Sequence, residues 1–372
     1  MLRIANIEVS KLNIPFNMTF SHASASRNST QSILVKVTTT CGLVGYGEGC
    51  PREYVTDESL DSAMVFIECK KNSVFESIHD LVSLENWVNE NESEIDAHPA
   101  AWCAVELAVL DVIAKLESCS IEKLLEIEIN RETFTYTAVL GNSELHVFEQ
   151  QVNQYKKLGL QDFKVKITGN LAEDNAKLDI VVQDNDLPRI RMDANNLWKR
   201  KEDVINYLKL LNHPIYALEE PLAPEQYDDL RDIARETGIQ IILDESFQRR
   251  LQLSCIVDNP GYWILNIRVS KMGGLIRSLD IINKAQDAGI PIIVGAHVGE
   301  TSLLTRAGLV IAQAAHNVII GQEGGFGTYL LKYDIWKRPL QFKKNGKLYF
   351  DLTKNVKPGF GLHINSRHNS VK

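Results

Sequence analysis

The sequence predicts an α/β protein in which an N-terminal α+β capping domain precedes a (β/α) barrel. From about residue 134 onward, eight short apolar runs alternate with longer amphipathic stretches. Eight strands that alternate with helices indicate a parallel sheet closed into a modified eight-stranded barrel. The part before them reads as an antiparallel sheet followed by helices. We therefore expect a capping domain over residues 1–130, the barrel over 131–337, and a C-terminal segment over 338–372 that packs back on the capping domain.

The expected capping domain begins with three strands. They are predicted over Ile4–Ile14, Gln31–Thr39 and Leu43–Gly47, and Cys41-Gly42 supplies the turn between the last two. The clearest helix follows at Ala100–Leu116, which is apolar almost all round. A helix with this pattern is buried, so we expect it to lie in the core of the first domain.

The barrel strands are expected at short β-rich runs. They are Phe134–Val139, Phe163–Ile167, Ile190–Met192, Ile215–Leu218, Ile239–Leu243, Trp263–Ile267, Ile290–Val294 and Val318–Ile320. Two of the intervening helices are predicted over Leu145–Leu158 and Tyr227–Thr237, each closed by a glycine. The tail shows hairpin-like alternation around Asn345-Gly346.

Composition excludes several classes of protein. The 372 residues include 40 Lys+Arg and 48 Asp+Glu, and the net charge of −8 argues against nucleic acid or an anionic membrane as the main partner. No apolar run approaches the roughly 20 residues that span a bilayer. The first residues lack a signal-peptide pattern, so we expect a cytoplasmic location. The six cysteines form no C-x-x-C pair and are read as reduced.

Polar residues at the ends of the expected strands are the candidates for chemistry, because active sites of barrels lie at the carboxyl ends of their strands. Successive members are 24 to 29 residues apart, about one strand-helix unit each. They are Lys166, Asp193, Glu219, Asp244, Arg268, His297 and Glu323.

Three of these residues, Asp193, Glu219 and Asp244, are carboxylates on consecutive strands. Taken singly, each could cap a helix or form a surface ion pair. Three carboxylates aimed at one point repel one another unless a hard cation lies between them. Mg²⁺ prefers such oxygen ligands, so we expect a magnesium site, with Mn²⁺ as the alternative cation.

Lys164 and Lys166 lie two residues apart on one expected strand, so both point to the same face. On an edge strand, two such lysines would simply extend into solvent and have no catalytic role. The apolar neighbours Phe163, Val165 and Ile167 favour a central strand instead. Two buried ammonium groups suppress each other's protonation, which moves a lysine toward the pKa of a general base.

Together these motifs resemble the enolase superfamily, in the branch of muconate-lactonizing enzymes, dipeptide epimerases and o-succinylbenzoate synthases, with features similar to mandelate racemase. The motifs that carry the resemblance are Lys-Val-Lys (164–166), Asp193-Ala-Asn195, Leu218-Glu-Glu-Pro221, Leu243-Asp-Glu-Ser246 and Asn266–Gly274, with Gly42–Gly49 and Pro51–Thr56 in the first domain.

The resemblance implies that a carboxylate substrate binds the metal and that Lys166 removes its α-proton. Lys164 would orient Lys166 and lower its pKa. Asn195 and Glu245 would support the site from behind. The resemblance also implies a homo-oligomer.

One position departs from the pattern of epimerases and cycloisomerases, which have a lysine where this chain has Arg268. A guanidinium is a poor proton acceptor but can clamp or stabilise an anion. Lys271 is three residues further on, so we do not expect it to occupy the same inward position. His297 and Glu323 resemble the histidine base and the carboxylic acid of mandelate-racemase-like members, although the usual aspartate partner of that histidine is not evident.

The leading hypothesis is a metal-dependent enzyme that abstracts an α-proton and then completes an elimination, cycloisomerisation or epimerisation. Alternatives are a racemase or acid-sugar dehydratase that uses Lys166 and His297, a non-catalytic metal-binding barrel, and an aldolase with Lys166 as Schiff base. The substrate is expected to be a small carboxylate. Arg27, Arg52 and Tyr54 lie in loops expected to close over the barrel. They suggest an anionic or polar distal group, or else are solvated loop residues.

Overall fold

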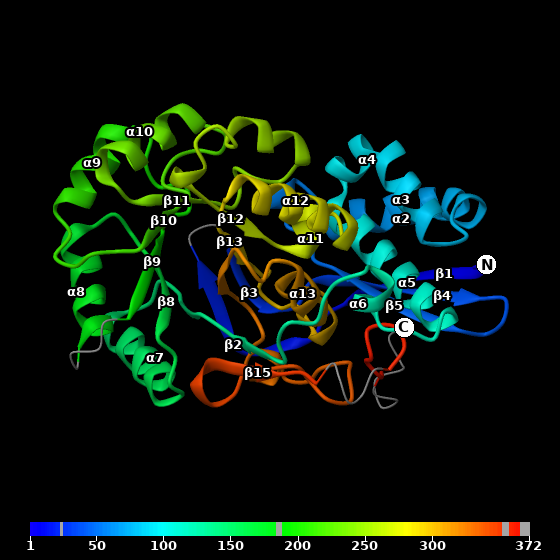
Figure 1. Ribbon diagram of the computed structural model, residues 1–372. Coiled ribbons are helices and arrows are strands. Elements are labelled where there is room, and N and C mark those ends of the chain that lie inside the picture. The colour runs from blue at the N-terminus through cyan, green and yellow to red at the C-terminus, as the bar shows by residue number, and fades with distance from the viewer. Residues whose placement is uncertain (23–24, 184–187, 352–356, 365–372) are drawn as a thin grey trace.

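The first domain contains the expected three-stranded antiparallel sheet. The computed structural model describes residues 1–22, 25–183, 188–351 and 357–364 (Figure 1). The strands are β1 (Ile4–Leu12), β4 (Ser32–Thr39) and β5 (Val44–Gly49), paired in the order β1-β4-β5. Ile33, Val35 and Val37 alternate on the fully buried face of β4 and are among the β-branched residues that predicted the strand.

A second hairpin in this domain was not expected from the sequence. Its strands are β2 (Pro15–His22) and β3 (Ala25–Ser29), which pair with each other and not with β1 or β4. The main-chain N–H of Asn17 donates to the carbonyl of Leu330 at 2.7 Å, and its side-chain amide donates to the carbonyl of Thr328 at 2.8 Å. The hairpin is therefore attached to the loop that follows the last barrel strand.

Helix α5 (Pro99–Leu116) fills the core of the first domain, as the apolar pattern predicted. It packs closely on β5 because that strand carries glycine at every second position. A Cβ atom on Gly47 would lie 1.9 Å from the carbonyl oxygen of Ala104, so no side chain fits there. The other helices of this part are α1 (Glu53–Thr56), α2 (Leu60–Ser77), α3 (Leu81–Glu90), α4 (Glu92–Ala97) and α6 (Ile121–Leu124).

The barrel is a curled sheet of eight parallel strands, which confirms the predicted fold. Its strands, in spatial as in sequence order, are β7 (Ala138–Leu140), β8 (Asp162–Lys166), β9 (Arg189–Asp193), β10 (Ala217–Glu219), β11 (Gln240–Leu243), β12 (Trp263–Ile267), β13 (Ile292–Val294) and β14 (Ile319–Gln322). The first and last strands meet where the N–H of Thr137 donates to the carbonyl of Gln322 at 2.7 Å. Ala217 and Ile242 lie two residues before Glu219 and Asp244 and therefore face the same way, into a small apolar cluster that fills the barrel below those carboxylates.

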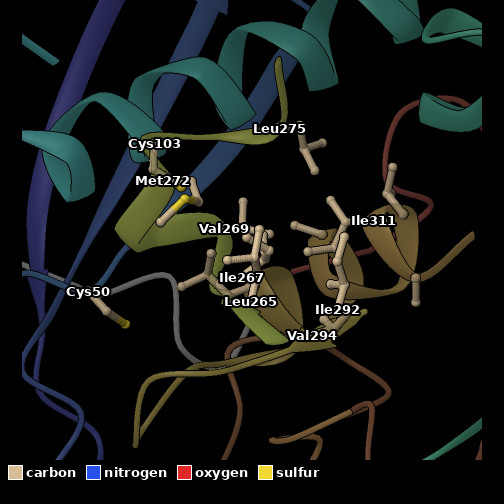
Figure 2. Packing of buried hydrophobic residues seen from close by; sticks show 14 of the residues in the cluster. Cys50, Cys103, Leu265, Ile267, Val269, Met272, Leu275, Ile292, Val294 and Ile311 are labelled. Carbon is tan, nitrogen blue, oxygen red and sulfur yellow. The ribbon is translucent and has the colours of Figure 1, made fainter. Parts of the chain in front are cut away.

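Helices surround this sheet. They are α7 (Leu145–Lys157), α8 (Leu171–Val182), α9 (Lys201–Lys209), α10 (Tyr227–Thr237), α11 (Val269–Met272), α12 (Leu275–Ala288) and α13 (Ser302–Ala314), with short 3-10 turns at Arg250–Cys255, Pro260–Tyr262, Gly327–Tyr329 and Lys344–Gly346. Figure 2 shows Leu265 and Ile267 of β12 packed near Ile292 and Val294 of β13. Gly238 closes α10 in the left-handed conformation with φ of 72°, as predicted.

Buried carboxylates of the first domain cap helices of the barrel. Glu48 on β5 accepts hydrogen bonds from the N–H of Thr301 at 3.0 Å and from its hydroxyl at 2.6 Å, at the start of α13. Glu106 on α5 accepts from the N–H of Ile276 at 3.1 Å, at the start of α12. Helix N-termini have unpaired N–H groups and a positive dipole end, so these contacts join the two parts by specific bonds.

The C-terminal segment returns to both parts. The chain turns at Asn345 and Gly346, and β15 (Lys347–Tyr349) then pairs antiparallel with β6 (Thr133–Thr135). Further on, the N–H of Phe360 donates to Asp111 of α5 at 3.0 Å. The boundaries after residues 130 and 337 remain predictions. In the described ranges, no helix has the length and apolar character to cross a bilayer.

Candidate active site

Most of the residues predicted for the site line one cavity of about 80 Å³ at the carboxyl ends of the strands. These are Lys164, Lys166, Asp193, Asn195, Glu245, Arg268, His297 and Glu323 from the barrel and Tyr54 from the first domain. Glu219 and Asp244 are buried directly behind them, each joined by a hydrogen bond to a lysine or arginine of the site. The register of the parallel strands explains this convergence, since Lys166, Asp193 and Glu219 are successive cross-strand partners.

Lys166 is held by two acceptors at the carboxyl end of β9. Its Nζ lies 2.9 Å from Oδ2 of Asp193 and 2.6 Å from Oδ1 of Asn195. Asn195 has a positive φ of 47°, which turns its side chain back toward the cavity, and its own N–H donates to Oδ1 of Asp193 at 3.1 Å. The amine that was predicted to be the base therefore has a fixed position in the cavity.

Lys164 lies among carboxylates. Its Nζ is 2.7 Å from Oε1 of Glu219, 3.4 Å from Oδ2 of Asp193 and 3.4 Å from Oε2 of Glu323. Burial alone would lower the pKa of Lys164, but these three carboxylates outweigh burial and raise it above its ordinary value. Without a bound cation, these carboxylates therefore favour the ammonium form of Lys164, opposite to the effect expected from Lys166 alone.

Asp244 is paired with two cations. Arg268 donates to its Oδ2, and Nζ of Lys271 lies 2.8 Å from its Oδ1. Burial opposes ionisation, yet Arg268 and Lys271 lower the pKa of Asp244 well below its usual range. Lys271 reaches Asp244 from α11 and is not among the described residues that line the cavity, so it does not share the position of Arg268.

The carboxylate oxygens of Asp193, Glu219 and Asp244 are ligands of the kind that a hard cation prefers. Glu219 keeps one oxygen, Oε2, fully buried and without a hydrogen-bond partner. Burial, with repulsion from Asp193 added to it, raises the pKa of Glu219 to about 8. Lysine and arginine side chains lie against the three carboxylates, and in the described part of the chain no three His, Cys, Asp or Glu side chains form a ready-made metal shell. A buried acceptor with no donor is nevertheless the group that a cation satisfies.

His297 is positioned by an unexpected partner. Its Nδ1 lies 3.3 Å from Nη1 of Arg268, and its side chain is only 3% exposed. Burial and then the charge of Arg268 lower the pKa of His297 well below its ordinary value. A guanidinium has no acceptor, so Nδ1 must accept and the proton of the neutral ring lies on Nε2.

Two further carboxylates at the site were not assigned by the sequence. Glu300 lines the cavity and accepts from the N–H of His297 at 2.7 Å, and burial raises its pKa to about 8. Glu220 is the next residue after Glu219, and its carboxylate accepts a hydrogen bond from the main-chain N–H of Asp244 at 2.6 Å. The Glu-Glu pair was a usable signal, because adjacent strand residues point to opposite faces and the second one needs its own partners.

Arg27 and Arg52, the two arginines predicted for the site, are not among the described residues that line the cavity. Arg52 is fully buried, and its described acceptors are the main-chain carbonyls of Thr30, Gln31, Pro51 and Val298. Arg27 donates to the side chain of Gln31 and lies 5.7 Å from the centre of the Tyr54 ring. Tyr54 is therefore the predicted residue of this domain that reaches the site.

A barrel with this order of lysines and carboxylates at its strand ends defines an enzyme of the enolase type. The model of the family described as "Enolase C-terminal domain-like" matches residues 147–368, which is more than half of the chain. The chain belongs to this family, in the mandelate racemase and muconate-lactonizing branch, and it is an enzyme of the enolase superfamily.

Relatives of known activity are similar over nearly the full length. The N-succinyl-L-Arg/Lys racemase of Bacillus cereus is 26% identical, over 98% of this chain and 96% of the relative. The hydrophobic dipeptide epimerase of Enterococcus faecalis is 26% identical over 85% and 89%. Muconate cycloisomerase 1 of Acinetobacter baylyi is 26% identical over 92% of each chain. All three are isomerase-type enzymes.

Solved structures agree on the fold. The structure of the Bacillus cereus racemase superposes with a TM-score of 0.85 at 25% identity and covers 98% of this chain and 96% of that one. A dipeptide epimerase from Cytophaga hutchinsonii, solved with Mg and the dipeptide D-Ala-L-Val, gives a TM-score of 0.87 at 22% identity and covers 99% and 97%. The eight-stranded barrel and its capping domain are thus shared with these proteins.

Proposed function

We propose that this enzyme is Mg²⁺-dependent and removes the α-proton of a small carboxylate substrate, with Lys166 as the base. The observation that carries the proposal is the position of Lys166, which lines the cavity with its Nζ 2.9 Å from Oδ2 of Asp193. The relatives named above support it, since racemisation, epimerisation and cycloisomerisation all act at a carbon next to a carboxylate.

Asp193, Glu219 and Asp244 would hold the cation, and the unpartnered Oε2 of Glu219 is the clearest acceptor for it. Bound Mg²⁺ would neutralise the substrate carboxylate and the negative charge that develops on it as the proton leaves. Glu220 fixes the main chain of Asp244, so that this carboxylate keeps its orientation. A cation here would also cancel the carboxylate charge that holds Lys164 protonated.

Lys166 must be neutral to accept the proton at Nζ. Asn195 and Asp193 accept hydrogen bonds from the amine and so orient its lone pair. Arg268 cannot be a second base, because a guanidinium keeps its proton at any ordinary pH. These groups favour a one-base reaction, in which Lys166 alone removes the α-proton and a syn elimination or lactone chemistry completes the turnover.

A racemase or dehydratase that uses Lys166 and His297 is the second candidate. It is supported by the place of His297 in the same cavity. The contact with Arg268 weighs against it, because an imidazolium beside a guanidinium is electrostatically unfavourable. His297→Asn separates the two candidates: the one-base reaction keeps its turnover, and the two-base reaction loses it while keeping exchange at the Lys166 face.

The test of the proposal is solvent-deuterium exchange into candidate acids with Mg²⁺ present. We expect exchange with the unsubstituted enzyme and none with Lys166→Ala, while the exposed control Lys199→Ala behaves like the unsubstituted enzyme. If Lys166→Ala exchanges as fast as the unsubstituted enzyme on every acid that turns over, the base is another group.

Two further outcomes would favour the remaining alternatives. Measurable Mg²⁺ binding without turnover on dipeptides, sugar acids and muconates would support a non-catalytic barrel. Borohydride trapping of a carbonyl substrate on Lys166 would support an aldolase. A homo-oligomer and a cytoplasmic location stay predictions, and light scattering during gel filtration measures the first.

A further inference from the structure

A second cavity opens beside the catalytic one. Its volume is about 420 Å³, five times that of the catalytic cavity at about 80 Å³. The two share Val139, Phe326 and Leu330 as lining residues, so they lie directly side by side. The other lining residues of this side pocket, as we call it, are Gly141, Asn142, Ser143, Val147, Gln151, Gln154, Tyr155, Leu158, Tyr329 and Phe342.

The order of the strands gives the side pocket a direction relative to the reacting atoms. Val139 on β7 is the cross-strand partner of Lys164 on β8. The carboxylates that would hold the cation lie on the other side of β8, on β9 and beyond. A substrate whose carboxylate points toward β9 and whose α-carbon lies at Lys166 therefore extends its remaining group toward β7, where the side pocket begins.

The walls of the side pocket are uncharged. None of the described residues that line it is Lys, Arg, His, Asp or Glu. Aromatic rings form one wall, with the Phe326 and Tyr329 rings 5.5 and 5.4 Å from that of Phe342. A charged group would lose hydration here without meeting an opposite charge among the described lining residues, whereas an aromatic or branched aliphatic group would find contacts.

Size leads to the same conclusion. A cavity of about 80 Å³ holds only a handful of water molecules and not the whole of an amino-acid derivative. A cavity of about 420 Å³ exceeds the roughly 150 Å³ that accommodates benzene in an engineered apolar site. The space for the larger part of a substrate is therefore in the side pocket.

We propose that the side pocket binds an uncharged aromatic or large aliphatic group of the carboxylate substrate and selects for it. The inference rests on the proposed function, because it takes the reacting carbon to lie at Lys166. It replaces the anionic or polar distal group suggested by Arg27 and Arg52, since neither guanidinium is among the described residues lining either cavity.

The variant that tests the proposal is Val147→Trp. Val147 lies in the first turn of α7 and lines the side pocket but not the catalytic cavity, so the indole would fill the pocket without touching Lys166. Glu149→Trp is the matched control, because Glu149 is exposed on the same helix. Thermal unfolding of both variants shows whether either indole disturbs the fold.

The probes are N-acyl amino acids that carry either a phenyl ring or a second charged group. This group is in the side chain in one set and in the acyl group in the other. N-Acetyl-L-phenylalanine is compared with N-acetyl-L-lysine and N-acetyl-L-glutamate, and N-benzoyl-L-alanine with N-succinyl-L-alanine. Calorimetric titration with Mg²⁺ present measures binding, and deuterium exchange measures turnover. We expect a phenyl compound of at least one set to bind about 10–100-fold more tightly than its charged counterparts, and Val147→Trp, but not Glu149→Trp, to abolish that preference.

Equal binding of phenyl and charged compounds in both sets would overturn the side-pocket proposal, as would a preference that survives Val147→Trp. The binding measurement does not depend on turnover. Tight, Val147-dependent binding without exchange on any compound would therefore count against Lys166 as base and leave the side pocket supported. Exchange without a phenyl preference would leave Lys166 supported as the base and overturn the side-pocket proposal.

Discussion

Nη1 of Arg268 lies 3.3 Å from Nδ1 of His297, and the arginine is the donor. A carboxylate in that place would hold a proton on Nδ1 and raise the basicity of the ring. The guanidinium does the reverse, since it occupies the lone pair of Nδ1 and opposes a positive ring. His297 is therefore suited to donate a hydrogen bond from Nε2 to substrate and is a poor base.

This relationship predicts an NMR signature. In ¹⁵N-edited spectra of the protein, His297 should remain the neutral Nε2–H tautomer from about pH 5.5 to 8, across the range where an ordinary histidine titrates. Arg268→Met removes the donor and the charge, and the pKa of His297 should then rise toward its ordinary value. The exposed His146 serves as the internal control. Titration of His297 near pH 6.5 in the unsubstituted protein would contradict the assignment.

Magnesium binding should depend on pH through Glu219. Burial raises the pKa of its carboxyl to about 8 in the protein without a cation, so protons compete with Mg²⁺ below that pH. We expect the Kd for Mg²⁺ to rise about tenfold for each pH unit below roughly 8 and to level off above it. Calorimetry between about pH 6 and 9 measures this. Glu219→Gln should bind Mg²⁺ weakly and without that slope, and a pH-independent Kd in the unsubstituted protein would refute the prediction.

Arg52 should contribute more to the stability of the folded protein than to recognition of an anionic substrate group. Its guanidinium is fully buried and joins the loop before α1 to the carbonyl of Val298, which lines the catalytic cavity. Arg52→Met would leave buried carbonyls without donors, and we expect a loss of about 2–4 kcal/mol in the free energy of unfolding. Urea denaturation measures it. The exposed Arg3→Met is the control, and an equally small effect of both substitutions would show that Arg52 is not structural.

Glu106 should make the stability of the protein depend on pH. Burial raises the pKa of its carboxyl to about 7 in the folded state, from an ordinary value of 4.5. The folded state thus binds the proton more tightly, so the associated stability is present below about pH 4.5 and is lost as the pH rises to 7. Relative to the unsubstituted protein, Glu106→Gln should gain on the order of 2 kcal/mol between pH 5 and 8. Parallel stability curves for the two proteins would contradict this.

The sequence was most informative where the fold repeats a simple unit. Parallel strands of a barrel begin and end in register, so a polar residue at one strand end predicts the position of the next. Lys166, Asp193 and Glu219 were found in this way, and the structure makes them neighbours.

Features that depend on distant partners were not predictable from local patterns. The hairpin of β2 and β3 is attached by contacts of Asn17 with carbonyls more than 300 residues away. The direction taken by the Arg268 side chain depends on Asp244 and His297, which come from two other strands. The pairing of β15 with β6 joins segments about 210 residues apart.

The contacts of Glu48 and Glu106 with the first turns of α13 and α12 restrict how such enzymes can diversify by recombination. The capping domain therefore cannot be transplanted onto the barrel of a relative as an independent module. The recipient would need a hydroxyl residue like Thr301 beneath the incoming carboxylate, or the graft would bury an uncompensated negative charge. Chimaeras should therefore succeed only when the cap and these two helix starts are inherited together.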